Sequence, residues 1–165
     1  MTIKTMDDLF LATVKDIYYA EKQILKALPT MVKKATSPEL KQALENHQNE
    51  TQEQISRLEQ IFQMLGTQAQ GKKCLAIEGI IAEAKEHMDE IDNANILDAG
   101  MISSAQAVEH YEICRYGTLI AWAKELGHDE AVELLEMTLE EEKNADELLS
   151  HIGTSSANHS AAAAE

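Results

Sequence analysis

The chain has 165 residues, of which 29 are acidic and 14 are basic, and its formal net charge at pH 7 is -15. This charge repels the phosphates of nucleic acids and the surfaces of anionic membranes, so both are poor candidates as partners. Strong helix formers dominate, and only seven glycines and two prolines interrupt them, which predicts one all-α domain. The sequence lacks a basic start followed by a long apolar run, and no stretch has the roughly 20 apolar residues of a membrane span, so we expect a cytoplasmic protein.

The first two predicted helices form a hairpin. The first helix covers about residues 6 to 35, begins after a capping box at Thr5, and carries apolar residues at helical spacing. Pro29 lies inside this helix and predicts a kink or a local break. Pro38 follows a capping serine and is typical of the start of a second helix, which should end before Gly66.

The second half of the chain repeats this arrangement. A shorter helix at about 73 to 93 is expected to be a crossover, and helices at about 97 to 126 and 129 to 151 then make a second hairpin. Residues 1 to 153 therefore predict an antiparallel four-helix bundle made of two helical hairpins. Residues 154 to 165 are rich in Ser, Asn and Ala, and we expect them to form a disordered tail.

Most of the acidic residues must lie on the solvated surface, but a few interrupt the apolar stripes of the predicted helices. Glu21, Glu112 and Glu142 each fall among apolar residues at helical spacing and should face inward. On the second helix the stripe allows either Glu50 or Thr51 at the corresponding turn, and we assign Glu50. Each of the four long helices is then expected to place one glutamate inside the bundle.

The helical rise of about 1.5 Å per residue tests this assignment, because it gives the depth of each acid in the bundle. Glu21 and Glu50 lie roughly 21 and 18 Å from the turn of the first hairpin. Glu112 and Glu142 lie roughly 21 and 20 Å from the turn of the second hairpin. The four carboxylates therefore share one layer. A second pair of acids lies at a common level one turn deeper: Glu109 and Asp146.

Carboxylates that cluster inside an apolar bundle need a neutralising partner, since two charges about 4 Å apart repel by roughly 4 kcal/mol at an effective dielectric constant of 20. Basic residues are scarce on the stripes, where only Arg115 stands near Glu112. Two divalent cations would balance four glutamates, and oxygen ligands suit iron, with manganese as the alternative. We therefore predict a di-metal site with six acidic ligands: Glu21, Glu50, Glu109, Glu112, Glu142 and Asp146.

Two other interpretations of the acids stay open. They could form a buried hydrogen-bonded network without metal, or helix rotation could carry several of them to the surface and leave only Glu21 and Glu112 half-buried. A lone histidine on such a stripe, as at position 47, is more often a hydrogen-bonded core residue than a ligand. The polar residues expected around the acids are His47, Gln54, Tyr19 and Tyr111.

Several segments together resemble the YciF-type bacterial stress-response proteins, over about residues 4 to 149. They are Asp16-Ile-Tyr-Tyr-Ala-Glu-Lys-Gln, His47 with Glu50-Thr51 and Gln54, Val108-Glu-His-Tyr-Glu-Ile, and Thr138-Leu-Glu-Glu-Glu-Lys. This resemblance implies a ferritin-like, rubrerythrin-like bundle with a di-metal site and a homodimeric assembly. The usual ferritin-like Glu-x-x-His motif is absent, because Glu53 and Ala145 stand three residues after Glu50 and Glu142. The pair Glu109 and Glu112 is instead similar to the doubled glutamate of rubrerythrins.

Two functions fit these expectations. In the first, a stress-response protein uses a metal pair to handle oxygen, peroxide or the metal itself, and no residue is assigned as catalytic. In the second, the protein is a non-catalytic stress or structural interaction protein, and the acidic cluster or its metal only stabilises the bundle. Iron storage in a large cage is a weaker interpretation, because no fifth helix is expected after Gly153 to build such a shell.

Overall fold

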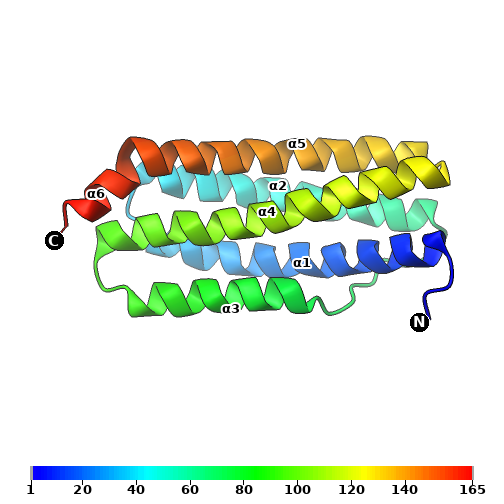
Figure 1. Cartoon of the computed structure of the whole chain (residues 1–165), viewed down its shortest axis with the longest axis horizontal. Coiled ribbons are helices and arrows are strands. Elements are labelled where there is room, and N and C mark those ends of the chain that lie inside the picture. The colour runs from blue at the N-terminus through cyan, green and yellow to red at the C-terminus, as the bar shows by residue number, and fades with distance from the viewer. Residues whose placement is uncertain (1, 165) are drawn as a thin grey trace.

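The computed structural model describes residues 2–164, and every regular element in this range is a helix (Figure 1). No helix within this range is both long enough and apolar enough to cross a bilayer. The five main helices are α1 (Met6–Lys34), α2 (Pro38–Met64), α3 (Leu75–Glu90), α4 (Ala94–Leu126) and α5 (Asp129–Ile152).

The four long helices form one elongated bundle in which neighbours run antiparallel, and α3 lies along the outside against α1 and α4 (Figure 1). The pairs α1–α2 and α4–α5 are the two hairpins, and α3 connects them. The predicted all-α bundle of two hairpins with a helical crossover is therefore confirmed.

Local capping interactions set the helix boundaries. The Thr5 side chain accepts a hydrogen bond from the Asp8 amide while the Asp8 carboxylate accepts one from the Thr5 amide, both at 3.1 Å, which completes the capping box before α1. The Ser37 hydroxyl accepts from the backbone in the first turn of α2, where Pro38 needs no donor. Gly127 ends α4 with a φ of 71°, a left-handed conformation that favours glycine.

Two local expectations differ from the structure. Pro29 does not break α1, which continues as one helix to Lys34. The segment after α5 is helical rather than disordered: Gly153–Ala157 forms a π-helical turn and α6 (Asn158–Ala162) follows it. Ala157 is buried and α6 packs against α4, so small residues rather than large apolar ones fix this segment. Met1 and Glu165 lie outside the described residues.

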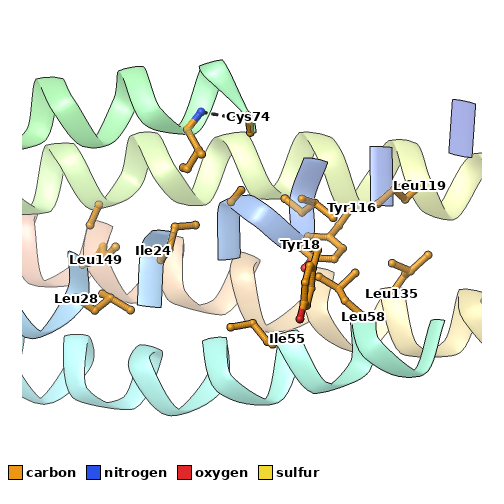
Figure 2. Close-up of a cluster of buried hydrophobic side chains, with 14 of the residues drawn as sticks. Tyr18, Ile24, Leu28, Ile55, Leu58, Cys74, Tyr116, Leu119, Leu135 and Leu149 are labelled. Atoms are coloured by element: carbon orange, nitrogen blue, oxygen red, sulfur yellow. Dashed lines mark hydrogen bonds between the residues drawn. The ribbon is translucent and has the colours of Figure 1, made fainter. Parts of the chain in front are cut away.

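The core is a continuous column of apolar side chains from all four long helices. Figure 2 shows Leu58, Tyr116 and Leu135 reaching from α2, α4 and α5 into the same interior space. Burying a side chain of this size contributes about 1.5–3 kcal/mol, so the apolar stripes drive the helices together.

A buried aspartate links the two hairpins. Asp98, on the first turns of α4 and only 4 % exposed, accepts hydrogen bonds from the Thr36 amide at 2.9 Å, the Thr36 hydroxyl at 2.6 Å and the Ser37 amide at 2.7 Å. Because both backbone donors belong to the α1–α2 turn, these bonds fix the height of the first hairpin relative to α4. This register decides which residues of the two hairpins meet at mid-height.

Replacing Asp98 with alanine is expected to lower the free energy of unfolding by about 2–4 kcal/mol, since it removes a buried carboxylate that accepts three hydrogen bonds from the α1–α2 turn. For a chain of this size the melting temperature should fall by about 5 to 15 °C, measured by circular dichroism. The exposed Asp92→Ala substitution is the control and should change the free energy by less than about 0.5 kcal/mol. Equal losses in both variants would contradict the assigned role.

Candidate metal centre

Four glutamates and one histidine are removed from solvent at mid-height in the bundle. Glu21 comes from α1, His47 from α2, Glu109 and Glu112 from α4, and Glu142 from α5. The glutamates are 0–2 % exposed and His47 is 6 % exposed. One ligand atom from each of four of them, all except Glu21, lies within 4.8 Å of the others. We call these five residues the acidic centre.

Most polar atoms of the acidic centre have no hydrogen-bond partner. This holds for both carboxylate oxygens of Glu112 and Glu142, both ring nitrogens of His47, and one oxygen each of Glu21 and Glu109. The His47 Nε2 atom lies 3.4 Å from Glu109 Oε1. A buried polar group left unpaired costs about 1–3 kcal/mol, and more when it is charged. This set of unpaired oxygen and nitrogen atoms therefore fits a bound cation.

Burial changes the proton affinity of every member of the acidic centre. Burial, with the charge of Glu142 nearby, raises the pKa of Glu21 to about 8. Burial also raises the pKa of Glu109 to about 7, and the pKa values of Glu112 and Glu142 rise well above the usual range for the same reason. Burial alone would lower the pKa of His47, but the neighbouring carboxylates outweigh it and the net shift is upward.

Basic side chains do not neutralise the acidic centre. Across residues 2–164, no lysine or arginine forms an ion pair with its glutamates. Arg57 donates to both carboxylate oxygens of Glu141, at 2.6 and 2.7 Å. Arg115, which the sequence placed near Glu112, lies instead over the Tyr111 ring, 5.3 Å from its centroid. Among the described side chains, His47 is therefore the one basic group within the acidic centre, and a single imidazole cannot balance four carboxylates.

Glu50 was expected inside the bundle, but Thr51 takes the buried position on α2. The Glu50 side chain is 42 % exposed, and its Oε2 atom lies 3.7 Å from His47 Nδ1. Thr51 is fully buried and donates a 2.8 Å hydrogen bond to the His47 carbonyl. Because a threonine hydroxyl can donate its hydrogen bond to a carbonyl of its own helix, Thr51 can be buried without a hydrogen-bond partner on another helix. Glu50 thus lies at the rim of the acidic centre.

Asp146 does not join the acidic centre either. Its side chain is 22 % exposed, accepts a 2.9 Å hydrogen bond from Gln106, and lies 3.1 Å from His110 Nε2. These partners are on α4, so Asp146 occupies a half-buried polar contact between α4 and α5. The sequence placed Asp146 at the same depth as Glu109, but in the structure its side chain contacts Gln106 and His110 instead of the acidic centre.

Among the polar residues expected around the acids, the α2 pair lies in the interior. His47 is itself a member of the acidic centre, although sequence reasoning favoured a core role for it. Gln54 is fully buried and donates to Glu141 at 3.1 Å, while its Oε1 atom has no partner. His47 lies one helical turn from Glu50, so the same depth calculation could have identified it as a residue near the glutamates.

The two expected tyrosines hold the crossover helix instead of the acidic centre. The Tyr19 hydroxyl donates to Glu78 on α3. The Tyr111 hydroxyl donates to Asp16 at 3.0 Å and lies 3.0 Å from the Sγ atom of Cys74, which caps α3.

The tyrosine that does reach the acidic centre is Tyr116. It is fully buried, points into the interior (Figure 2), and donates its hydroxyl hydrogen bond to Glu21. Tyr116 stands four residues after Glu112 on the same stripe of α4, so helical spacing could have identified it.

Comparison with known proteins gives near full-length matches. Residues 5–162 match a family described as a domain of unknown function, DUF892. The chain is 39 % identical to Protein YciF of Escherichia coli K12 over 162 residues, which is 98 % of each sequence. No activity is named in either description.

Solved structures agree with these matches. The crystal structure of the E. coli stress protein YciF has a TM-score of 0.90 at 39 % identity, covering 94 % of this chain and 99 % of that one. YcfI of Rhodopseudomonas palustris, described as a candidate structural protein, has a TM-score of 0.89 at 55 % identity, covering 90 % and 94 %. A Xanthomonas campestris protein with 22 % identity and a TM-score of 0.74 shares the fold, with 94 % of each chain covered.

Proposed function

Because the chain belongs to the DUF892 family and is related over nearly its whole length to YciF, we propose that it is a stress-response protein whose bundle binds two divalent metal ions. One observation carries the proposal: four glutamates are buried together with most of their oxygen atoms unpaired, and no lysine or arginine within residues 2–164 is paired with them. Two divalent cations would balance four ionised carboxylates.

The donor set indicates which metals fit. His47, Glu109, Glu112 and Glu142 would hold the ions, with Glu21 as a further carboxylate ligand, so the set is rich in oxygen and has one imidazole. Such ligands suit iron and manganese. A bound iron pair would supply redox chemistry toward oxygen or peroxide. The protein's own contribution is to orient the ligands, as Tyr116 does for Glu21, and to exclude water with its apolar core.

A second function is favoured by the description of YcfI as a candidate structural protein, at 55 % identity. In this alternative the metal or the protonated acids stabilise the bundle, and the protein performs no reaction. The expected homodimer remains a proposal in both cases, and light scattering would report it as twice the 18.3 kDa mass of the chain.

Metal analysis of the purified protein after anaerobic loading with Fe²⁺ tests the metal proposal. We expect about two equivalents in the wild type and less than about a tenth of that in a Glu112→Gln, Glu142→Gln variant, because two central carboxylates are neutralised. Glu133→Gln, at an exposed position on α5, is the matched control and should keep full occupancy. Equal occupancy in all three proteins, or none in the wild type, would exclude this metal site.

Peroxide consumption separates the two functions. The iron-loaded wild type should consume peroxide faster than the loaded double variant if the site is redox-active. Equal rates in the two proteins, with metal bound only by the wild type, would leave the stabilising role as the function of the site.

A further inference from the structure

An apolar cavity of about 470 Å³ lies beside the acidic centre and is lined by residues of α1 to α5. Its walls include Ile24, Leu28, Met31, Leu44 and Leu149, all of them buried. Protein interiors hold few voids larger than a water molecule, whereas pockets for small ligands measure about 300–1,000 Å³. This hollow opens to the surface in the half of the bundle near the α1–α2 turn, and its volume is that of a pocket for a small ligand.

The inner end of the cavity carries polar atoms without partners. Both His47 and Glu109 line it, and both are more than nine-tenths buried. Neither ring nitrogen of His47 has a hydrogen-bond partner, and the same is true of Glu109 Oε2. A hydroxyl group can donate to an acceptor and accept from a donor at once, so it satisfies such a mixed pair.

The missing histidine of the ferritin-like motif helps to explain the space. Ala145 stands three residues after Glu142, where Glu-x-x-His would have its histidine, and it lines the cavity. A methyl group at this position leaves room that an imidazole would fill. The absence of a histidine at position 145 therefore contributes to the volume of the cavity.

Charge limits the chemistry of the occupant. At the inner end, Glu109 and the neighbouring Glu142 are buried and no lysine or arginine of residues 2–164 pairs with them, so a buried anionic group would find no lysine or arginine to pair with there. At the rim, the Lys34 ammonium is already paired with Asp89 at 2.9 Å. The walls therefore select an apolar body, and the inner end selects an uncharged polar group.

We propose that this cavity binds a neutral amphiphile, such as a primary alcohol of medium chain length, with its chain along the apolar walls and its hydroxyl group at His47 and Glu109. The hydroxyl contacts share His47 and Glu109 with the proposed metal centre, so binding is tested on the metal-free protein, where its failure is distinguishable from a failure to bind metal.

Fluorescence of the neutral apolar probe N-phenyl-1-naphthylamine, measured with the full-length metal-free protein, tests the proposal. The probe should brighten on binding, and 1-decanol should displace it at concentrations at least tenfold lower than decanoate does. Decanoate has the same chain length as 1-decanol but carries a carboxylate. If it bound, its carboxylate would pair with the exposed Lys85 on the rim, in the orientation opposite to the one proposed for the alcohol. Tighter binding of decanoate, or no binding of the probe, would overturn the proposal.

A matched pair of variants locates the binding site. Ala145→Leu places a larger side chain in the cavity and should weaken 1-decanol binding at least tenfold, whereas Ala12→Leu makes the same change at a half-buried position of α1 outside the cavity and should have little effect. Thermal unfolding confirms that both variants are folded, and metal analysis of Ala145→Leu shows whether the metal site is intact. Unchanged alcohol binding by a folded Ala145→Leu protein would contradict the assignment.

Discussion

Adding Mn²⁺ to the metal-free protein at pH 8 is expected to raise its melting temperature by about 5 to 10 °C for each ion bound, at free metal a hundredfold above the dissociation constant. Binding to the folded state alone contributes about 2.7 kcal/mol under these conditions. A chain of this size gains about 2–4 °C per kcal/mol. The physical source is the acidic centre, where the metal would neutralise buried carboxylates that pair with no lysine or arginine of residues 2–164.

Calorimetry with and without a chelator measures this shift. Glu142→Gln should lose most of it, since Glu142 has two unpaired carboxylate oxygens in the acidic centre, and the exposed Glu133→Gln control should retain it. A wild-type melting temperature that stays constant on adding and removing Mn²⁺ would argue against a bound ion at this site.

The metal-free protein should become less stable as the pH rises from 5 to 8. Glu21 and Glu109 have pKa values of about 8 and about 7 in the folded protein, against an ordinary value of 4.5. Between these values the folded state holds protons that the unfolded state has lost, so the free energy of unfolding falls as the pH increases. The slope is about 1.4 kcal/mol per pH unit for each such carboxyl group.

Other titrating groups do not reverse this direction. The raised pKa of His47 acts in the same sense, since a group that binds protons more tightly when folded stabilises the protein at low pH. The acids with lowered pKa values titrate below this window: Asp8, Glu78 and Asp89.

Urea unfolding of the metal-free protein at several pH values measures the trend. Glu112→Gln should reduce the slope and should be more stable than the wild type at pH 8 without metal, because it replaces a buried carboxyl group with a neutral amide. Glu133→Gln should keep the wild-type slope. Stability that is flat or rises between pH 5 and 8 would show that the buried acids do not hold their protons.

The helices and the four buried glutamates could be predicted, Glu109 from its depth along the bundle and the others because their signals are local and strong. Capping residues and helical periodicity gave the boundaries to within a few residues, and Glu21, Glu112 and Glu142 interrupt stripes that are otherwise apolar. The α2 stripe is different, since it contains His47, Thr51 and Gln54, all of them polar and all buried. Polar residues carry little information on which face of a helix points inward. Successive residues of a helix point about 100° apart, so an error of one residue was enough to assign the inward position to Glu50 instead of Thr51.

Features that depend on packing between distant segments were out of reach. The roles of Tyr19 and Tyr111 follow from how α3 docks on α1 and α4, which no local pattern specifies. The cavity depends on the combined volumes of side chains from five helices. The helical segment after Gly153 forms because small residues fit against α4, and its composition resembles that of a linker.

The anchoring role of Asp98 has a consequence for the proposed binding of metal. Its hydrogen bonds align the hairpins from one end of the molecule, well away from the buried glutamates. The positions of the proposed ligands would then be imposed by the scaffold before any ion binds, and binding would require little rearrangement of the backbone. Replacing a buried glutamate with glutamine should therefore give a well-folded protein that differs only in having a neutral amide in place of one carboxyl group.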